Sequence, residues 1–465
     1  MVATWTLTAD RGYVTSTGRP PRIALPTIPV DPPLTVDIIS RVHGVAAPSV
    51  PPTSLKHPGV LHGTAQLNYV AAELAAVGGN PSKVGWAAML AGRCNLPNSS
   101  TNGRLWSDLT WTPAPRRVVG RGANGSPSEG DQDELADSIA AYCHALIWAY
   151  TGVRASAVLA TRIMNAWATG PYAVQTHLFD TATYPEGGVL SGWTGGMWPR
   201  PAEIIRYTFT PTGSEPWFDA DGFAGMLRRT VFPNVRNGWA SGGAAWLMSM
   251  AAGHITSAVY CDDHAEIAAG LTNFRAWLPS AIWMPGDVNR WPLLTGLPIS
   301  PTGTIYDQPT QTRDGFVAYW GAPVGDPPWV AGLSSSTGRD PTHVGMTIAS
   351  ISNACETMRL QGVDLWSEAE TRIAAAMELN ASYFHAAFID GNVTPVGWPF
   401  TQPVNTSIID GVHRVTWRAG YNHYAGRLGM VLPNTAALIT DFVEPATVVA
   451  IPPSAFEGLT FPGTP

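Results

Sequence analysis

Charged residues are scarce in this chain of 465 residues: Asp, Glu, Lys and Arg make up only 13% of it, and the formal net charge is -7. Lysine occurs only at Lys56 and Lys83, and no run of Lys and Arg is present. Because proteins neutralise nucleic-acid phosphates with clustered Lys and Arg, this composition argues against a nucleic-acid partner. The preference for arginine over lysine is typical of a GC-rich genome.

Cysteine is also sparse, with four residues and no CxxC pair. Cys143, Cys261 and Cys355 lie in apolar helical patterns, where a free cysteine behaves as a small core residue. Without paired cysteines the sequence does not indicate a zinc site or a redox centre. We therefore expect no metal site.

Long apolar runs are missing as well. No uncharged apolar stretch approaches the ~20 residues that span a bilayer, so we expect no membrane insertion. The first residues, Met1–Trp5, contain no basic region followed by an apolar run, so no secretory signal is visible. We expect a soluble protein that, if it acts outside a cell, either leaves by another route or is carried on a virion.

Proline, in contrast, is abundant and crowds the first part of the chain, between Pro20 and Pro52. Such a segment favours extended or polyproline geometry and cannot form a helix. We expect residues 1–54 to form an extended arm that docks on a larger particle, and residues 442–465 to form a proline-rich tail. Residues 55–441 are predicted to form one domain between them.

Helical periodicity, with apolar residues recurring at threes and fours, dominates this domain. It predicts helices joined by turns and loops, without strands between them, over about residues 63–77, 81–92, 131–150, 155–169, 200–209, 221–232, 244–260, 263–279, 341–362, 367–389 and 422–430. Helix pairs that follow one another in sequence predict a mainly α fold, an (α/α) toroid or incomplete barrel of paired antiparallel helices.

The clearest concentration of polar chemistry lies at Thr337–His343, where a turn-rich loop meets the helix predicted from Pro341. Asp340 followed by Pro341 is a helix-start signature, because aspartate caps the first turn and proline needs no hydrogen-bond partner there. Arg339 and His343 are thereby placed at a helix N-terminus, where anions are favoured. The alternative is that Arg339 pairs with a nearby carboxylate and His343 is an ordinary polar residue of the first turn.

A second concentration lies in the segment 417–427, which combines cations, phenols, an amide and an imidazole. Its candidate site residues are Tyr421, Asn422, His423 and Arg427. A core helix has no use for so many polar groups in succession, and a solvated face has little use for the aromatic ones. A surface helix with aromatic caps is the alternative.

Tryptophan is frequent, with 19 residues, and indole faces stack on sugar rings. Two segments combine tryptophan with glycine and polar residues, and the first of them, Ser191–Arg200, is predicted to be a glycine-rich turn. Both segments either line a saccharide groove or fill gaps between helices. Their candidate residues are Trp193, Trp198, Arg200, Asn237, Trp239 and Trp246.

Other chemistries find less support. No GxSxG, P-loop or HExxH motif is present, and His57 and His62 are not at a metal-ligand spacing on a helix. The pair Asp262–Asp263 lies in a turn between helices and is expected to cap the second. A glycoside hydrolase needs two carboxylates across a groove, and no such pair is singled out.

Several pieces of the sequence share an order and a spacing with a known family. They are Lys56–His62, Gly79–Pro81, Ala140–Gly152, Ile163–Trp167, Ala202–Thr208, Ala258–Asp263, Arg339–His343, Gln361–Leu365 and Tyr421–Tyr424. Together they resemble the alginate-lyase-domain family of polysaccharide lyases, helical-toroid enzymes that act on uronic-acid polymers. The resemblance covers roughly residues 56–440.

The resemblance implies β-elimination of a polysaccharide without a cofactor. The C5 proton of a uronate is removed, and the glycosidic oxygen at C4 leaves. The chemistry requires a base, a proton donor and a cation that neutralises the uronate carboxylate. Carried onto matching positions, His343 is the leading base, Tyr421 the general acid and Arg339 the cation, although the roles of His343 and Tyr421 are open to exchange. The secondary site residues are Asn422, His423 and Arg427.

One position departs from the family pattern. Relatives carry Asn before Trp or His at the start of the helix that ends in the Asp pair, whereas the simplest register places Ala245 there. Asn237 supplies the amide instead if the loop is longer. Otherwise a non-catalytic glycan-binding or structural virion protein is the alternative, and a glycoside hydrolase is a weaker one. The N-terminal arm, the missing signal and the arginine bias suggest a phage-encoded enzyme, with an exported bacterial enzyme as the alternative.

Overall fold

The computed structural model describes residues 50–180, 182–236, 243–289, 317–325, 329–406, 417–443 and 455–461. The chain divides into two compact units, Met1–Gly44 and Val45–Pro465, and all of the described residues belong to the second. Nearly all of the predicted docking arm, residues 1–54, therefore lies outside the described residues. Among the helices that are described, none is long and apolar enough to cross a membrane.

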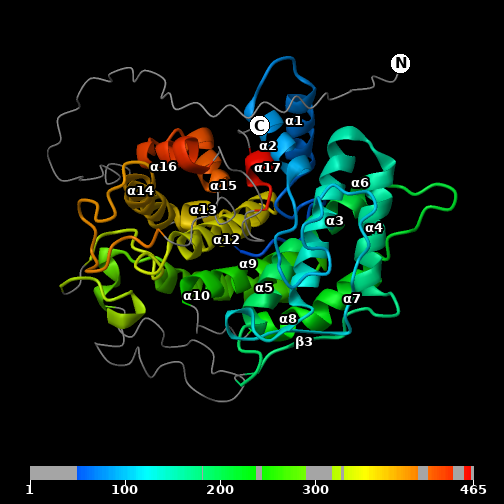
Figure 1. Ribbon diagram of the computed structural model, residues 1–465, viewed down its shortest axis with the longest axis horizontal. Coiled ribbons are helices and arrows are strands. Elements are labelled where there is room, and N and C mark those ends of the chain that lie inside the picture. Colours follow the sequence, from blue (N-terminus) through cyan, green and yellow to red (C-terminus); the bar gives the residue numbers. More distant parts are fainter. Residues whose placement is uncertain are drawn as a thin grey trace. The chain divides into compact units, whose positions relative to one another are not determined.

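A series of neighbouring helices forms the inner layer of the second unit (Figure 1). They are α3 (Asp131–Thr151), α5 (Gly187–Met197) followed by α6 (Pro199–Thr208), α9 (Ala244–Tyr260), α12 (Pro341–Leu360), and α15 (Arg418–Tyr421) followed by the π-helix η4 (Asn422–Arg427). Residues at their C-terminal ends meet at one place: Asp262 after α9 and Gln361 after α12 both bond the segment 57–59. Helices α9 and α12 therefore run in the same direction.

Outer helices alternate with the inner ones along the chain. They are α4 (Arg154–Ala168), α7 (Ala220–Thr230), α10 (His264–Ala281), α14 (Glu370–Phe388) and α16 (Pro433–Leu438), preceded by the pair α1 (Thr64–Ala75) and α2 (Pro81–Ala91). Short elements complete the unit: α8 (Phe232–Val235), α13 (Leu365–Glu368), α17 (Glu457–Thr460), η2 (Ala123–Gly125), η3 (Pro285–Asn289) and η5 (Ile439–Val443). This alternation confirms the predicted (α/α) toroid of paired helices.

Local signals in the sequence set where these helices begin and end. Asp340, Asp263 and Asn80 each accept a hydrogen bond from the backbone N–H three residues on, and Pro341 occupies the first position of α12. Gly152 ends α3 with a φ of 71°, a conformation that costs glycine little. The capping roles predicted for Asp340 and Asp263 are confirmed.

The segment predicted as a glycine-rich turn instead forms most of helix α5, which packs against α9, and the start of α6. Its glycines serve close packing: a Cβ on Gly253 of α9 would stand 2.3 Å from the carbonyl oxygen of Gly192 in α5. Because glycine lowers the intrinsic stability of a helix, the glycines in this segment predicted a turn. In the structure, the missing side chains instead let the backbones of α5 and α9 approach closely.

A small sheet was also not foreseen. It contains β1 (Val118–Arg121), β2 (Ser128–Glu129) and β3 (Thr176–Leu178) in the order β2-β1-β3, with β1 antiparallel to β2 and parallel to β3. The strands have two to four residues, too few for an alternating pattern to stand out in the sequence. The sheet lies beside the N-terminal half of the inner layer, where β1 contacts α3 and α5.

The interior is rich in tryptophan, and the three cysteines predicted to be core residues are buried and unpaired. Among the described residues, seven tryptophans are fully buried: Trp106, Trp167, Trp198, Trp277, Trp283, Trp320 and Trp366. For these side chains, filling the core is the role that the structure supports.

The C-terminal helix α17 packs beside the first helices of the unit, α1 and α2, and also contacts α15 (Figure 1). Residues 455–461 belong to the predicted proline-rich tail, yet almost all of their side chains are buried. This part of the tail therefore belongs to the packed unit, at the place where its first and last helices meet.

Candidate functional site

The N-terminal ends of α9 and α12 lie side by side at one end of the inner layer. Gly243, the residue before α9, approaches Ser335 in the loop before α12. Two turns further along, the hydroxyl oxygens of Ser249 and Ser350 are 3.0 Å apart, so the two helices continue in parallel. The Arg339–His343 motif therefore stands at the start of α12, next to the start of α9.

Asp340 and His343 form a hydrogen-bonded pair at this end. The Asp340 carboxylate accepts a hydrogen bond from the backbone N–H of His343 at 2.8 Å, and imidazole Nδ1 lies 2.8 and 2.7 Å from its two oxygens. Because an ionised carboxylate only accepts, Nδ1 carries the hydrogen, and Nε2 of the neutral ring keeps its lone pair. Within the described residues no group bonds Nε2, and the His343 side chain is 21% exposed.

Arg339 supplies a cation next to this pair. Its side chain is 48% exposed, and its Nε lies 3.5 Å from the Asp340 carboxylate, as the alternative for Arg339 expected. Burial would raise the pKa of Asp340, but the hydrogen bonds from His343 and the charge of Arg339 outweigh it and hold that pKa below its usual value. Asp340 is thus ionised at neutral pH, and the arginine still reaches solvent.

The other histidines that contact a carboxylate differ from His343. In the described part of the chain, His57, His177 and His385 have carboxylates or hydroxyls at both ring nitrogens, and His254 is fully buried. Only His343, among these, combines a ring nitrogen held by a carboxylate with a second one open to solvent. This combination is what a general base requires.

The second predicted cluster is mostly engaged in packing. His423 is buried, stacks on Trp366 with ring centroids 4.5 Å apart, and has a pKa lowered to about 4 by burial and by the charge of Arg427. Arg427 itself forms a bidentate ion pair with Glu356, with N···O distances of 2.8 and 2.9 Å. Asn422 donates to the backbone oxygen of Phe461 at 2.6 Å. Of the four candidates, only Tyr421 has a partly exposed side chain that makes no hydrogen bond or ion pair with another described residue.

The backbones of the two predicted catalytic residues lie at different levels along α12. Gly420 lies against Ser352, whose hydroxyl would be 3.3 Å from an added Cβ. Ser352 is nine residues beyond His343 on α12, a rise of roughly 13 Å along the helix axis. Tyr421 therefore stands well inside the inner layer, whereas His343 stands at its N-terminal end.

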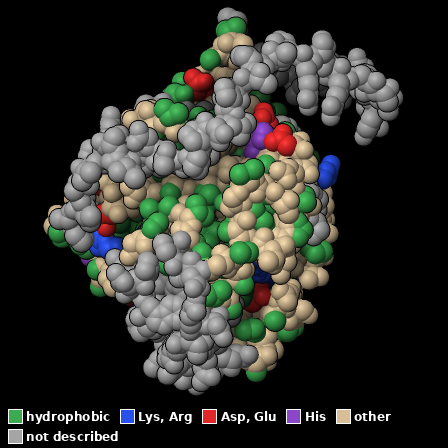
Figure 2. Space-filling model, turned by 90° about the vertical axis from the view of Figure 1, so that its left-hand side faces the viewer, with side chains coloured by type: hydrophobic (Ala, Val, Ile, Leu, Met, Phe, Trp, Pro, Cys, Tyr) green, Lys and Arg blue, Asp and Glu red, His purple; other side chains and the backbone are tan. Residues whose placement is uncertain are grey.

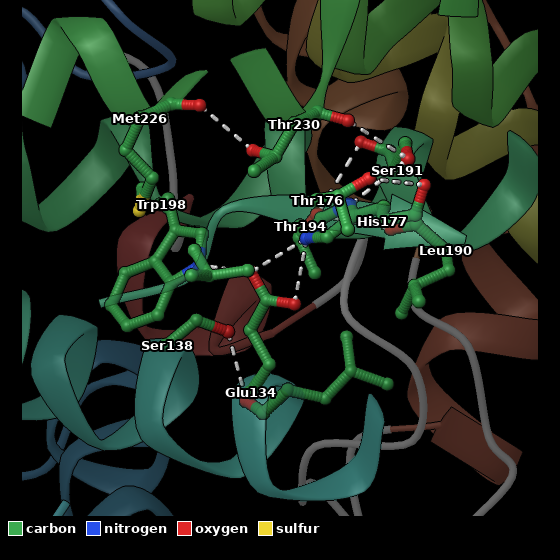
Figure 3. Close-up of polar contacts among 12 residues, drawn as sticks. Glu134, Ser138, Thr176, His177, Leu190, Ser191, Thr194, Trp198, Met226 and Thr230 are labelled. Carbon is green, nitrogen blue, oxygen red and sulfur yellow. Dashed lines mark hydrogen bonds and ion pairs between the residues drawn. The ribbon is translucent and has the colours of Figure 1, made fainter. Parts of the chain in front are cut away.

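Trp198 and Arg200 lie inside the core, which corrects the expectation that they line an open saccharide groove. Trp198 is fully buried, and its indole N–H donates to Glu134 at 3.0 Å (Figure 3). The same Glu134 bonds His177, whose other ring nitrogen lies 3.0 Å from the hydroxyl of Ser191. This Ser-His-Glu arrangement resembles a hydrolase triad, but all three side chains are buried, so it holds α3, α5 and β3 together.

The remaining tryptophan candidates are placed differently. Trp193 is partly buried on α5, with the guanidinium of Arg121 at 5.2 Å from its ring. Trp246 is the third residue of α9 and is buried, next to the fully buried Ala245. Asn237 and Trp239 lie outside the described residues. That Asn237 supplies the missing amide therefore stays a prediction.

The end of the inner layer opposite His343 holds a cluster that the sequence did not predict. His57 bridges Glu203 at 2.9 Å and Asp262 at 3.0 Å, and its ring stacks on Tyr207. Burial lowers the pKa of His57, but the carboxylates of Glu203 and Asp262 raise it by more, so that the pKa lies above its usual value. No local signal reveals this cluster, because its members are 146 and 205 residues apart in sequence.

Among the described residues, no group of three or more His, Cys, Asp or Glu side chains is arranged to hold a metal ion. Figure 2 shows one face of the molecule, and charged side chains are few among its coloured atoms.

Comparisons with solved structures identify the architecture. Alginate lyase A1-III from Sphingomonas species A1 superposes with a TM-score of 0.50 at 12% identity, over 88% of this chain and 98% of that chain. Two variants of alginate lyase A1-III complexed with a tetrasaccharide give the same TM-score and identity, over 88% of this chain and 99% and 98% of theirs. The chain has the fold of an alginate lyase. No family model matches the sequence, and no curated protein does.

The alginate-lyase fold explains why the pieces that carried the sequence resemblance recur in this order. His57, Glu203, Asp262 and Gln361 come from four of those pieces, and they meet at one end of the inner layer. The resemblance is thus confirmed at the level of the fold. The spacing of the matching pieces in the sequence reflects the contacts among these four residues at one end of the inner layer. It also reflects the Arg339–His343 motif at the opposite end.

Proposed function

We propose that this protein is a polysaccharide lyase that cleaves a uronic-acid-containing glycan by β-elimination. The observation that carries the proposal is the Asp340–His343 pair, which presents an open imidazole Nε2 beside the exposed cation of Arg339. The alginate-lyase fold supports a glycan substrate, since two neighbours with this fold are complexed with a tetrasaccharide. The proposed reaction uses side chains alone and involves no cofactor.

The proposed chemistry assigns one task to each group. Arg339 pairs with the uronate carboxylate, so that the charge developing there as the C5 proton leaves is stabilised. The lone pair of His343 Nε2 takes that proton, the electrons of the C5–H bond form the C4–C5 double bond, and the C4–O bond breaks. Asp340 holds the imidazole in the required tautomer and stabilises the imidazolium that results.

The leaving oxygen needs a proton, and Tyr421 is its predicted donor. His343 and the backbone next to Tyr421 are separated by roughly 13 Å along the axis of α12. The side chains of His343 and Tyr421 would therefore approach the substrate from different depths of the inner layer. The roles of base and acid are also open to exchange between them. The two residues are therefore best tested separately.

A non-catalytic glycan-binding protein is the second candidate, and one observation favours it. Ala245, in the register expected to supply a neutralising amide, is a buried apolar residue. A site without that amide would bind a uronate but stabilise the developing anion less. A glycoside hydrolase is weaker, because it needs two carboxylates across a groove and the sequence singles out no such pair.

A single assay separates the three functions. The chain is incubated with a panel of uronic-acid polymers, including alginate, while unsaturated uronate absorbance and reducing ends are followed together. A lyase increases both, a hydrolase increases reducing ends alone, and a binding protein increases neither. If no polymer of the panel yields unsaturated ends, the lyase proposal fails, and affinity for the same polymers then tests the binding alternative.

A further inference from the structure

The segment Lys56–His62, which follows the predicted arm and precedes α1, lies across one end of the inner layer. It is neither helix nor strand, so side chains of other elements hold its backbone. Gln361 after α12 accepts from the backbone N–H of Lys56 at 2.8 Å and donates to the oxygens of Lys56 and Gly59, both at 3.0 Å. The position of the segment therefore depends on a few individual side-chain contacts.

His57 supplies the charged part of this attachment. Its Nδ1 lies 2.9 and 3.0 Å from the two carboxylate oxygens of Glu203 on α6, and its Nε2 lies 3.0 Å from Asp262 after α9. An ionised carboxylate only accepts hydrogen bonds, so both ring nitrogens must carry a hydrogen when both contacts are made. The geometry therefore requires an imidazolium, which joins the segment to two inner helices.

The two carboxylates depend on this cation to different degrees. The Glu203 side chain is 1% exposed, whereas that of Asp262 is 50% exposed. Within the described residues, the groups that donate to Glu203 are His57 and the backbone N–H of Gly59, at 2.7 Å, and both belong to the segment. Burying a carboxylate is unfavourable unless cations or donors replace the lost water. A neutral His57 would turn a ring lone pair towards one of the carboxylates and weaken the attachment.

The groups packed around His57 from α6 and from the end of α9 keep their charge between about pH 6 and 9. Tyr207 stacks on the imidazole with ring centroids 4.7 Å apart, and burial raises its pKa to about 12. Burial also raises the pKa of the Cys261 thiol to about 12 and that of Tyr260 further. Burial lowers the pKa of Arg206, but neighbouring phenols and carboxylates raise it by more, so this residue stays a cation.

Further ionisable groups lie close to His57 in sequence or next to Asp262. Lys56 is exposed, and burial lowers the pKa of His62 to about 3, so the His62 ring is neutral over the same pH range. The carboxylate of Asp263 caps α10 and lies 3.9 Å from Arg228. Among the described side chains in contact with the two carboxylates, the change of charge over this range therefore falls on His57.

We propose that His57 is a protonation-dependent latch, whose imidazolium fixes the segment Lys56–His62 to the ring and whose neutral form releases it. Burial lowers the pKa of His57, but the hydrogen bonds and charges of Glu203 and Asp262 raise it by more. The attachment is therefore complete below the ordinary value of 6.5 and is lost as pH rises through the raised value. The latch controls how firmly the domain holds the residues that follow the predicted docking arm.

The latch is independent of the proposed lyase chemistry, because His343 stands at the opposite end of the inner layer. An attachment that depends only on packing and neutral hydrogen bonds makes a different prediction, since its strength would not change between pH 6 and 9. The dependence on pH therefore distinguishes a latch from a purely structural contact.

Hydrogen–deuterium exchange of the full chain, measured by mass spectrometry from about pH 6 to 9.5 and corrected for the intrinsic rate, tests the latch. It follows the backbone amides of Gly59 and Leu61, which donate to Glu203 and to the hydroxyl of Thr357. Their protection should fall at least tenfold as pH rises, while peptides of the buried helix α3 keep theirs. His57→Gln, which cannot become charged, should show the low protection at every pH.

A second variant keeps the test decisive if His57→Gln does not fold. Asp262→Asn removes one of the two charges at a half-exposed position, and asparagine tolerates the left-handed backbone found there, with a φ of 53°. The midpoint of release should fall by about one pH unit, the lower end of the effect of an adjacent charge. Asp263→Asn changes the neighbouring carboxylate, which caps α10, and should leave the midpoint unchanged. The proposal is overturned if protection of Gly59 and Leu61 in the parent does not depend on pH, or if the two aspartate variants have the same midpoint.

Discussion

Asp340 bonds both the backbone and the side chain of His343: its carboxylate accepts from the backbone N–H at 2.8 Å and from imidazole Nδ1 at 2.7 Å. One residue therefore caps helix α12 and orients a histidine that projects from its first turn. The two tasks use different properties, because capping needs an acceptor oxygen and holding an imidazolium needs a negative charge. A substitution that keeps the oxygen and removes the charge separates them.

Asp340→Asn is that substitution, since Asn caps helices about as well as Asp. We expect unchanged thermal stability, a KM close to that of the parent and a kcat lowered at least tenfold on the polymer that the parent cleaves. His343→Ala should lower kcat by about 10²–10⁴-fold, the usual contribution of a general base. Asp263→Asn makes the same change at the N-cap of α10, at the other end of the inner layer, and should leave kcat unchanged. Equal losses from both aspartates would show that capping alone matters.

Arg339 is expected to act through its charge on the substrate carboxylate. Arg339→Ala should reduce kcat/KM by about tenfold or more, and Arg339→Lys should restore part of it, because lysine keeps the charge but not the planar geometry of the guanidinium. Arg162→Ala, at an exposed position of the outer helix α4, controls for the loss of a surface cation and should have no effect. An Arg339→Ala variant with unchanged steady-state kinetics would remove this residue from the proposed mechanism.

The sequence predicted features whose causes are local. Asp340 and Pro341 are adjacent, so the start of α12 and the placement of His343 could be predicted, and apolar periodicity located most helices within a few residues. The glycines of α5 led to the wrong prediction of a turn. They allow close packing against Gly253, a residue of another helix. A sequence shows that glycine is flexible but not which backbone approaches it.

Features that join distant segments could not be predicted in this way. The bridge from His57 to Glu203 and Asp262 depends on how the ring closes, as does the burial of Trp198 and Arg200. Nothing near Glu457 indicates that a proline-rich tail returns to the interior. Contacts across the ring decide these cases, and they follow from the complete fold rather than from any single stretch.

Glu356 provides a test of the second predicted cluster, since it pairs with both Arg359 and Arg427. Burial would raise its pKa, but the hydrogen bonds and charges of the two arginines lower it from 4.5 to about 2. Because the folded-state pKa lies below the unfolded value, the pair stabilises the protein above about pH 4.5, and this stabilisation is lost as pH falls towards 2.

Glu356→Gln should therefore lower the free energy of unfolding by about 3 kcal/mol at pH 7, because two arginines lose a buried partner. The difference from the parent should shrink in unfolding curves measured near pH 3. Glu215→Gln removes a carboxylate that pairs with Arg154 on the surface and should change stability little. A Glu356→Gln variant as stable as the parent would indicate that Arg427 is free to bind substrate, as the sequence alone suggested.

The contact between Gly192 and Gly253 predicts a contrast between two glycine substitutions in helices. A Cβ on Gly253 would stand 2.3 Å from the oxygen of Gly192 and 2.8 Å from its Cα, so Gly253→Ala must force α5 and α9 apart. Overpacking of this kind costs about 1–3 kcal/mol, more than the roughly 1 kcal/mol that alanine contributes through helix propensity. Gly196→Ala is the matched control, because a Cβ there meets nothing closer than 4.0 Å. Chemical denaturation should show Gly253→Ala destabilised and Gly196→Ala as stable as the parent or more so. If both variants gained stability, the two helices would not be in the close contact described.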